Sequence, residues 1–423
     1  MQKSRGWRVF LTLPVLSWAL YDFANTIFSS NITTIFFPFY IQEAAGGNER
    51  LDQIASTFLS YANAVSSFFL VLFSPLFGVW IDRTGRKKRY VVSFALTAIL
   101  FTALMGLIAP LRLGEFGGLP AAFTIVVVLF VAAKFFYQSS LIFYDAMLPD
   151  IATKDTISVL SGFGVAVGYL GTLVGLTVYP LVSGGNYADA FLPTAILFFI
   201  FTLPMMLAYK ETPAAKLEKR PFFAGYRDVW ETFKEMRSYR SIFLFMIVYF
   251  FINDAIATAI AMMAVYAKAI VGFTSSEFIL LYLVSTVSSI IGSFIFGYIT
   301  RAASAKKAVF YVGFILFSAL LLGTFAVNRP MFWVTGSLFG AALGAVWVTS
   351  RVFIIELSPE DKRGQFFGLF AFSGKLSAIV GPLMYGTITL MLADYGDIAS
   401  RIALASLMLF VLIGLLVHRK IPE

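Results

Sequence analysis

The sequence predicts an all-α integral membrane protein with twelve transmembrane helices in two pseudo-symmetric six-helix bundles. Three observations carry this prediction. Of the 423 residues, 59% are hydrophobic and only 13% are charged, whereas a soluble domain carries about 25% charged residues. The apolar residues gather in twelve segments, each close to the roughly 20 residues that a helix needs to cross a bilayer. Lys and Arg are concentrated in alternate connections between these segments. Most of the surface is therefore expected to face lipid.

Each predicted span is expected to be helical, because backbone amides in lipid must be hydrogen-bonded within their own segment. The basic N-terminus leads into the first span without a small-residue cleavage site, so we expect a retained span rather than a cleaved signal peptide. The predicted spans cover residues 15–41, 57–81, 90–110, 120–145, 157–183, 190–209, 241–268, 277–300, 307–327, 331–356, 364–391 and 400–418.

The distribution of basic residues predicts the orientation. The two termini, the central loop and the loops after spans two, four, eight and ten hold most of the Lys and Arg, an excess of about five to one over the other side. Both termini are therefore expected in the cytoplasm. The net charge of +9 is explained by this bias, and no nucleic-acid partner is expected. The short loops favour a bacterial cell membrane.

A polar stretch at residues 210–240 divides the chain. It separates an N-terminal bundle, residues 1–209, from a C-terminal bundle, residues 241–423. The pattern of residues from Tyr226 to Tyr239 predicts an amphipathic helix on the cytoplasmic surface. Six-span halves are a recurring plan in transporters, with the substrate site near the membrane midplane.

The two halves carry related sequences. FGVWIDRTGRKK, from Phe77 to Lys88, resembles FGYITRAASAKK, from Phe296 to Lys307, and the two follow equivalent spans. After spans four and ten, DAMLPDI from Asp145 resembles ELSPED from Glu356. The pairs indicate an internal duplication.

The loop after span two is identified as the signature of the major facilitator superfamily, a resemblance that covers nearly the whole chain. It implies two bundles that rock about a central site. The motif is Gly78-x-x-x-Asp82-Arg83-x-Gly85-Arg86-Lys87-Lys88.

The residues of this loop predict a cytoplasmic gate. Gly85 permits a tight turn, and Asp82 is placed to meet the positive N-terminal end of span eleven near Gly364. The alternative is a basic turn that only obeys the topology rule. In the second half Arg301 replaces Asp82 and Ser304 replaces Gly85, so gating is not expected there. The predicted gate comprises Gly78, Asp82, Arg83, Gly85, Arg86, Asp145, Arg351 and Glu356.

The first span opens with Trp-Ala-Leu-Tyr-Asp-Phe-Ala-Asn, from Trp18 to Asn25. This segment resembles the first span of the vacuolar amino-acid effluxers, the autophagy-related branch of the superfamily, which has many bacterial members. The resemblance implies export of amino acids or similar small solutes.

Five ionisable residues fall inside predicted spans, where each costs roughly 2.5–3.5 kcal/mol and usually acts in a cavity. They are Asp22, Lys134, Asp254, Arg351 and Lys375. In the superfamily that the chain resembles, spans one, four, seven and ten line the central cavity, and four of these charges lie on them.

These charges have several possible roles. Lys134 and Asp254 could hold the two ends of a zwitterion. Alternatively Lys134 or Lys375 pairs with Asp254 and only fixes the helices. Asp22 and Asp254 are the candidate proton carriers, and sodium is less favoured because few buried acids are available. Arg351 lies near the cytoplasmic end, where Glu356 or Asp145 could pair with it. The candidate substrate-binding or coupling residues are Asp22, Asn25, Lys134, Asn253, Asp254, Lys375, Tyr21 and Tyr137.

The composition excludes several chemistries. The chain has no Cys and a single His, so disulfides, zinc and other metal sites, thiol catalysis and iron–sulfur clusters are not expected. His418 is expected at the surface. Without a nucleophile–base signature, neither an enzyme nor a cofactor is predicted.

The leading interpretation is a monomeric secondary transporter that moves a small polar or zwitterionic solute by alternating access, with amino-acid export as the specific hypothesis. One alternative is efflux of amphipathic drugs or lipids. Another is a non-transporting membrane sensor.

Overall fold

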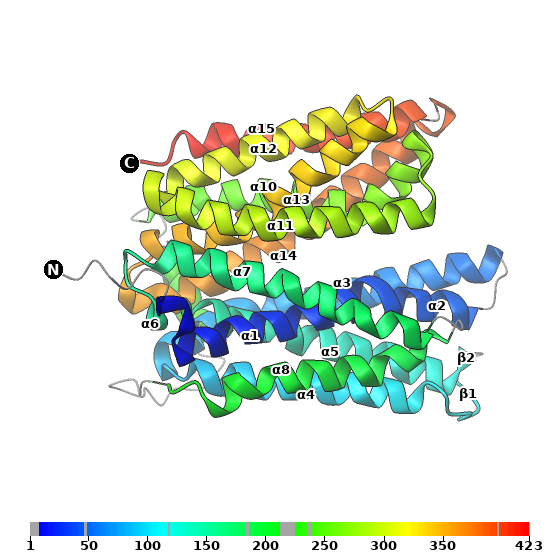
Figure 1. The fold of residues 1–423 in the computed structure, drawn as a ribbon, viewed down its shortest axis with the longest axis horizontal. Helices are drawn as coiled ribbons and strands as arrows, with labels where there is room; N and C mark the ends of the chain where they lie inside the picture. Colours follow the sequence, from blue (N-terminus) through cyan, green and yellow to red (C-terminus); the bar gives the residue numbers. More distant parts are fainter. Residues whose placement is uncertain are drawn as a thin grey trace. The chain divides into compact units, whose positions relative to one another are not determined.

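The computed structural model describes residues 8–45, 49–116, 119–182, 186–211, 225–234, 239–395 and 397–422, and almost all of them are helical (Figure 1). The helices group into two compact units. One comprises Met1–Ile151 and Val167–Lys219, and the other comprises Ala152–Ala166 and Arg220–Glu423. The boundary between the units falls inside one helix, α7.

The N-terminal unit begins with a short 3-10 turn, η1 (Arg8–Leu11), and also holds a two-stranded antiparallel hairpin, β1 (Glu115–Phe116) with β2 (Leu119–Pro120). Two further 3-10 turns are η3 (Leu176–Val182) and η4 (Tyr187–Ala190). Its helices are α1 (Leu13–Phe28), the π-helix η2 (Ser29–Phe36), α2 (Phe37–Ala45), α3 (Glu49–Thr84), α4 (Lys87–Ile108), α5 (Ala121–Asp145), α6 (Leu148–Ile151), the second half of α7 (Ile157–Gly175) and α8 (Phe191–Leu207).

The C-terminal unit contains the first half of α7 and seven further α-helices of the described chain. They are α9 (Gly225–Lys234), α10 (Arg240–Val271), α11 (Ser275–Ala303), α12 (Ala305–Thr324), α13 (Arg329–Leu357), α14 (Arg363–Met391) and α15 (Asp397–His418), with the 3-10 turns η7 (Glu360–Lys362) and η8 (Ala393–Tyr395).

The predicted spans are confirmed. Eleven helices of the described chain are long and apolar enough to cross a membrane. The predicted first span is a continuous helical run from Leu13 to Ala45, formed by α1, η2 and α2. Its π-helical middle widens the turn, a feature that is often found at functional sites.

Local sequence explains where the helices begin and end. The left-handed conformation of Gly85, at φ 60°, ends α3, and that of Gly272, at φ 68°, ends α10. The Thr274 side chain accepts the N–H of Glu277 and the Glu277 side chain accepts the N–H of Thr274, a capping box that starts α11. Asn328 caps α13 in the same way, by accepting the N–H of Met331.

Small residues bring the spans into close contact, as membrane helices require. Along α11 and α13, Gly340 lies against Ser285 and Gly344 against Ser289. The Ser289 hydroxyl also donates a hydrogen bond of 2.7 Å to the carbonyl oxygen of Gly340. These contacts make α11 and α13 a tightly packed pair.

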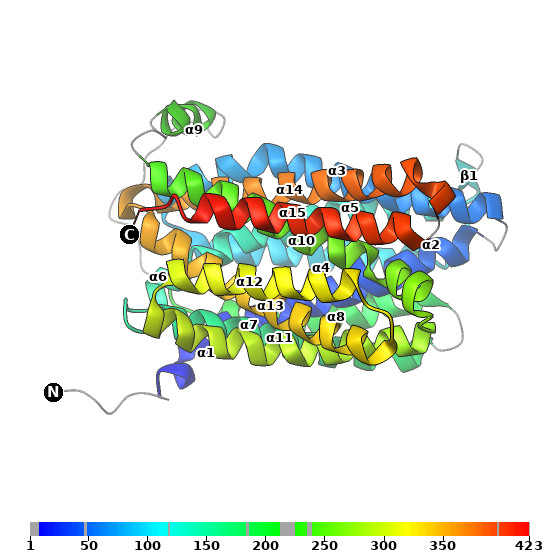
Figure 2. The ribbon, with the colours of Figure 1, turned by 90° about the horizontal axis from the view of Figure 1, so that it is seen from above.

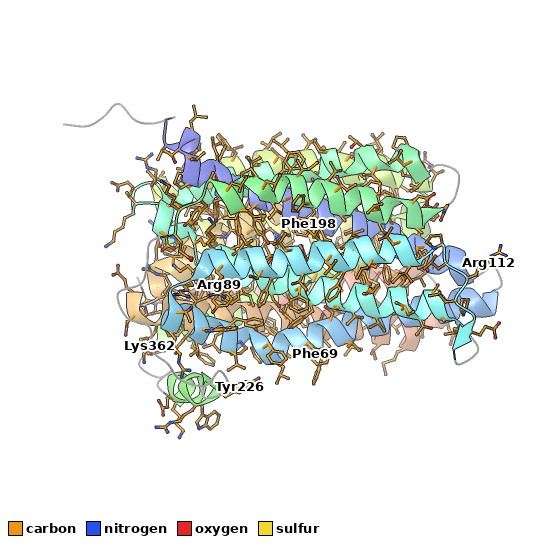
Figure 3. The ribbon with its side chains drawn as sticks, turned by 90° about the horizontal axis from the view of Figure 1, so that it is seen from below. Phe69, Arg89, Arg112, Phe198, Tyr226 and Lys362 are labelled. Carbon is orange, nitrogen blue, oxygen red and sulfur yellow. The ribbon has the colours of Figure 1, made fainter. Side chains whose placement is uncertain are left out.

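The outer surface of the bundles is apolar between charged ends. Phe69 on α3 is 42% exposed, whereas Phe198 on α8 is fully buried between helices. Arg89 and Arg112 lie at opposite ends of the α4 span (Figure 3). This distribution suits a helix that crosses a bilayer with its basic residues in water.

The helix predicted in the central loop is present as α9. It lies across the direction of the long helices of its unit (Figure 2). Its Trp230 side chain is 59% exposed, and Arg227 forms an ion pair of 2.9 Å with Glu231. The remainder of the predicted helix and linker, residues 212–224 and 235–238, lies outside the described residues.

The expectation that His418 lies at the surface was wrong. Its side chain is only 3% exposed, and its Nε2 lies 2.9 Å from the carbonyl oxygen of Lys306. The rings of Phe310 and Phe353 lie beside it. The last turn of α15 packs against the start of α12, so His418 is covered by its neighbours, while Arg419 and Lys420 beyond it are exposed.

Candidate substrate and ion sites in the membrane spans

In the N-terminal unit, Asp22 lies in α1 against the glycine face of α7. A Cβ placed on Gly168 would come within 2.8 Å of the Asp22 Oδ2 and 3.3 Å of the Thr26 hydroxyl. Asp22 is half-buried, and its neighbour Asn25 is 2% exposed. A side chain at position 168 would displace this carboxylate, so the glycine lets Asp22 lie close to α7.

The two candidate tyrosines are packed between helices. The Tyr21 hydroxyl donates a hydrogen bond of 2.7 Å to the Ser140 hydroxyl on α5. Tyr137 on α5 stacks on Phe28, with ring centroids 4.7 Å apart. Tyr21 is fully buried and Tyr137 is 7% exposed. Both therefore join α1 to α5.

Lys134 lies on the same helix as Tyr137. Its Nζ donates a hydrogen bond to the side-chain oxygen of Asn63 on α3 and lies 5.9 Å from the centroid of the Phe130 ring. The side chain is 7% exposed. Asn63 was not among the predicted site residues, although an amide inside a span is itself a sign of a buried polar contact.

Asn31, in the π-helix η2, was also overlooked. Its Nδ2 donates hydrogen bonds of 2.8 Å to the carbonyl oxygen of Gly175 on α7 and of 3.1 Å to the Thr194 hydroxyl on α8. It is fully buried. One amide thus connects three spans of this unit.

In the C-terminal unit, Asp254 is fully buried in α10. Its Oδ1 accepts a hydrogen bond of 2.8 Å from the backbone N–H of Gly381 on α14, next to Pro382, which lies inside the same helix. Its Oδ2 and the Thr258 hydroxyl are buried without a hydrogen-bond partner among the described residues. The carboxyl group therefore lies beside a proline inside α14, which has no backbone N–H to donate.

Asn253 is fixed by two hydrogen bonds to α14. Its Nδ2 donates to the carbonyl oxygen of Gly374 at 2.8 Å and to the Ser377 hydroxyl at 2.9 Å. The side chain is 8% exposed. Asn253 therefore holds α10 against α14 next to the buried acid.

Lys375 is the remaining cation in the middle of a span. Within the described part of the chain it has no hydrogen-bond or ion-pair partner, and its side chain is half-buried. A pair between Lys375 and Asp254 was one of the expected alternatives, but no such ion pair is formed.

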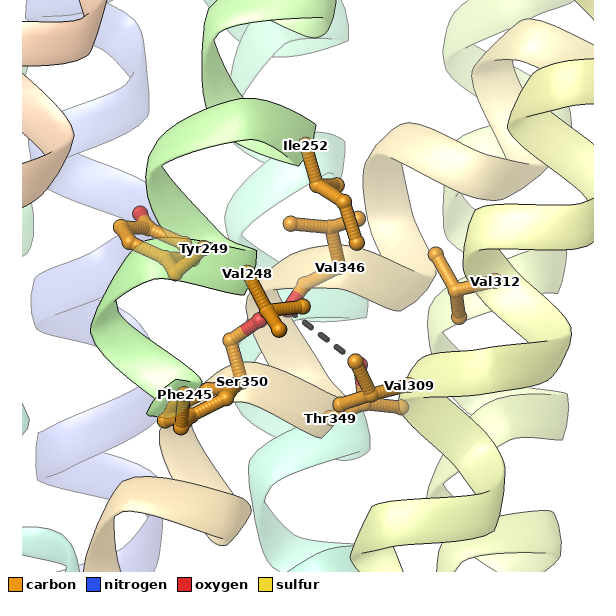
Figure 4. Close-up of a pocket in the computed structure, with 9 residues that line it drawn as sticks. All are labelled: Phe245, Val248, Tyr249, Ile252, Val309, Val312, Val346, Thr349 and Ser350. Carbon is orange, nitrogen blue, oxygen red and sulfur yellow. Dashed lines mark hydrogen bonds between the residues drawn. The ribbon is translucent and has the colours of Figure 1, made fainter. Parts of the chain in front are cut away.

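Two hollows in the C-terminal unit contain none of these residues. One is a narrow space among α10, α12 and α13 that is too small for a water molecule. It is lined mostly by Val and Ile side chains, and the Thr349 hydroxyl donates to the Val346 carbonyl oxygen at 3.4 Å (Figure 4). The other is a groove of ≈ 500 Å³ between α11 and α13, which includes the exposed Ile291 and Val334. Both are too apolar to hold a charged solute.

The loop after α3 makes polar contacts within its own unit. Both oxygens of Asp150, on α6, accept hydrogen bonds of 2.8 Å from the Lys87 Nζ. The backbone N–H of Lys88 donates to Glu211 at 2.7 Å, and its Nζ donates to the Tyr209 carbonyl oxygen at 2.6 Å. Partial burial raises the pKa of Glu211, although the hydrogen bond from Lys88 opposes the shift.

The other predicted gate residues are spread over several helix ends. Gly78 is buried in α3, Asp82 and Arg83 are half-buried in its last turns, and Arg86 is exposed. Asp145 is the half-buried last residue of α5. Arg351 is 6% exposed in α13, and no ion pair joins it to the exposed Glu356 one turn later. The gating role of this set stays a prediction.

Comparison with known proteins agrees with this architecture. The family model described as "Vacuole effluxer Atg22 like" matches residues 50–421. The chain is 26% identical over 422 residues to YxiO of Bacillus subtilis (strain 168), described as an uncharacterized MFS-type transporter, over 96% of this chain and 94% of that one. It is 23% identical to Autophagy-related protein 22-2 of Aspergillus clavatus, over 59% of this chain and 46% of that longer relative.

Solved structures share the fold. The human organic anion transporter MFSD10 superposes with a TM-score of 0.71 at 14% identity, over 97% of this chain and 99% of that one. A bacterial homologue of the iron transporter ferroportin gives 0.70 at 14% identity, over 96% and 98%. At this identity the likeness is to the fold alone. The twelve spans, the loop signature and the match over most of the sequence agree that the chain is a transporter, not an enzyme, and belongs to the vacuole effluxer Atg22-like family of the major facilitator superfamily.

Proposed function

We propose that this chain is a secondary active transporter that exports a small zwitterionic solute, such as an amino acid, by alternating access. The observation that carries this proposal is the absence of an ion pair between Lys375 and Asp254. A half-buried cation and a buried acid of one bundle are not neutralised by each other, although such groups in a membrane usually pair unless they serve a ligand or an ion.

Each group then has a distinct role. The Lys375 ammonium binds the carboxylate of the solute. Asp254 takes up and releases the proton that drives transport, because a charged carboxylate at this position would lack a counter-ion. Membership of a vacuole effluxer-like family and similarity to an MFS-type transporter support export by a transporter.

The proposed membrane context follows the basic residues. We place the chain in a bacterial cell membrane as a monomer with both termini in the cytoplasm, as the distribution of Lys and Arg predicts. YxiO, a full-length relative, is a Bacillus protein.

The test is counterflow of labelled amino acids in proteoliposomes, with and without a pH gradient. The variants are Lys375→Gln and Asp254→Asn, with the exposed Lys420→Gln and Asp394→Asn as matched controls. We expect Lys375→Gln to raise the half-saturating solute concentration at least about tenfold, which corresponds to about 1.4 kcal/mol. Asp254→Asn should abolish the gradient-driven component and leave counterflow intact.

Two results would overturn the proposal. If no amino acid exchanges while amphipathic dyes or lipids do, the chain is an exporter of amphiphiles. If Lys375→Gln transports like the wild type, its ammonium group does not bind the solute.

A further inference from the structure

Thr258 lies four residues after Asp254 on α10, so the two side chains share one face of this helix. A Cβ placed on Gly381 of α14 would overlap the Thr258 hydroxyl and would come within 2.6 Å of the Asp254 Oδ1. Both side chains are fully buried. The hydroxyl and the carboxyl group therefore lie side by side in the close contact between α10 and α14.

The hydroxyl of Thr258 is not bonded to its own helix. A threonine inside a helix commonly donates to the carbonyl oxygen four residues earlier. Three buried threonines of the same unit do so at 2.6, 2.9 and 2.9 Å, namely Thr300, Thr324 and Thr349. The Thr258 Oγ1 has no hydrogen-bond partner among the described residues, and it lies against Gly381 instead.

Asp254 has one hydrogen-bond donor within the described chain. The Gly381 N–H donates to Oδ1 at 2.8 Å, and Oδ2 is buried without a partner. A buried carboxylate oxygen without a donor is costly, whereas a protonated oxygen needs an acceptor. A hydroxyl group can serve as either, because it both donates and accepts. The Thr258 hydroxyl therefore matches the requirement of Oδ2 in both protonation states.

No charged side chain takes this part. Within the described chain Asp254 forms no ion pair, and its polar contact is the Gly381 N–H. The helices beside α10 are α11, α12, α13, α14 and α15. Their described charged and titratable side chains, together with those of α10, are Arg240, Tyr249 and Tyr266 on α10, Glu277, Tyr282, Tyr298 and Arg301 on α11, Lys306, Lys307 and Tyr311 on α12, Arg329, Arg351 and Glu356 on α13, Arg363, Lys375 and Tyr385 on α14, and Arg401 and His418 on α15.

We propose that Thr258 is the positioning residue of the proton site and that its hydroxyl serves both forms of Asp254. It donates to Oδ2 of the carboxylate, and it accepts the Oδ2–H of the carboxylic acid. The proton binds to Oδ2 and leaves from Oδ2, so the hydrogen bond from Gly381 to Oδ1 stays in place throughout.

Thr258 then assists the release of the proton. A hydrogen bond to a charged carboxylate is about twice as strong as one between neutral groups, so the hydroxyl favours the carboxylate over the acid. The inference rests on the proton coupling proposed for Asp254, and it adds the residue that lets the buried acid give up its proton.

Infrared difference spectroscopy tests this role without any substrate. The full chain is reconstituted in lipid, and spectra are recorded from alkaline to acidic pH. We expect a carboxylic-acid carbonyl band that grows as the pH falls and is lost in Asp254→Asn. Thr258→Val removes the hydroxyl and keeps the branched shape, so the midpoint of this band should move about one to two pH units higher. Thr258→Ser, which restores a hydroxyl, should return it close to the wild-type value.

Thr300→Val is the matched control, because the Thr300 hydroxyl donates to the Phe296 carbonyl oxygen of its own helix. It should leave the midpoint unchanged. A wild-type midpoint in both Thr258→Val and Thr258→Ala overturns the inference but leaves Asp254 as the proton carrier. A Thr258→Ser variant that titrates like Thr258→Val also overturns it, since the shift would then arise from packing. If Asp254→Asn removes no band, the proposed proton carrier itself fails, and the inference fails with it.

Transport gives a second measurement. In proteoliposomes with an amino acid that shows counterflow, Thr258→Val should reduce the gradient-driven component and leave counterflow intact, because only the former requires the proton to leave. Equal loss of both would assign Thr258 to packing and overturn the inference. If counterflow fails for every amino acid, the proposed substrate class fails, while the infrared titration still decides the role of Thr258.

Discussion

Gly85 and Ser304 occupy equivalent positions in the two related loops, and both have a positive φ, 60° and 103° respectively. The duplicated loop has thus kept its backbone turn after losing the glycine. Ser304 is the only described residue other than glycine with a positive φ. Such a conformation costs a residue with a Cβ about 1–3 kcal/mol.

Replacing Ser304 with glycine is therefore expected to stabilise the protein. The Ser304 hydroxyl accepts a long hydrogen bond of 3.4 Å from the N–H of Lys307, and losing it should cost only a few tenths of a kcal/mol. We expect Ser304→Gly to raise the melting temperature in detergent. Ser358, which has a φ of −86° at the end of α13, provides the control Ser358→Gly, which should give no gain. Equal gains in both variants would exclude strain at Ser304.

The close contact of α11 with α13 predicts a strong effect at Gly344. A Cβ there would overlap the backbone carbonyl of Ser289, whereas nothing lies within 4 Å of a Cβ at Gly386 on α14. Overpacking of this kind costs about 1–3 kcal/mol or more. Gly344→Val should lower the yield of monodisperse protein and its melting temperature, and Gly386→Val should not. Similar behaviour of the two variants would show that the packing of α11 on α13 is not limiting.

Asn253 is predicted to stabilise the contact between α10 and α14. Interhelical hydrogen bonds in membranes contribute about 0.6 kcal/mol on average and up to about 1.7, and Asn253 donates two. Asn253→Ala should therefore destabilise the chain by about 1–3 kcal/mol in a denaturation series. Ser318→Ala removes a hydrogen bond within α12 alone and should have little effect. A loss of the same size in both variants would contradict a specific link between the spans.

The hydrophobicity of the sequence was sufficient to predict the spans. A helix that crosses a bilayer needs a run of about 20 apolar residues, and this run can be found without knowing which helices it packs against. The same hydrophobicity pattern identified Asp254 and Lys375 as candidate site residues, because charged residues are rare inside a span. The partners of such residues could not be predicted. Asn253 finds Gly374 more than a hundred residues away, and no local pattern indicates which glycine carbonyl it will meet.

The contacts of Asn31 and the burial of His418 were not predicted, and both have the same physical origin. The π-helix at Ser29–Phe36 lets Asn31 reach both α7 and α8, but the segment looks like any other apolar helix in the sequence. His418 follows an apolar span and precedes basic residues, so it looked exposed, yet α12 covers it. In both cases packing between helices, rather than hydrophobicity, determines the environment.

Glu211 should make stability depend on pH near the membrane surface. Its pKa is raised in the folded state, chiefly by partial burial, so the folded chain binds more protons than the unfolded chain just above the usual pKa of a glutamate. Stability then falls as the pH rises through this window. Glu211→Gln should remove that part of the slope in melting temperatures measured across the window. The exposed Glu360 provides the control Glu360→Gln, and an unchanged slope in Glu211→Gln would assign it to another group.

The absence of cysteine allows a direct test of the orientation. Arg89 and Arg112 are both exposed and lie at opposite ends of the α4 span (Figure 3). The distribution of basic residues places Arg89 in the cytoplasm and Arg112 outside. In intact cells a membrane-impermeant maleimide should label Arg112→Cys at once and Arg89→Cys only after permeabilisation. Trp230→Cys, on the exposed face of α9, should behave like Arg89→Cys, because both lie on the side that carries the central loop. The cysteine-free parent reports the background, and the reverse pattern would place both termini outside the cell.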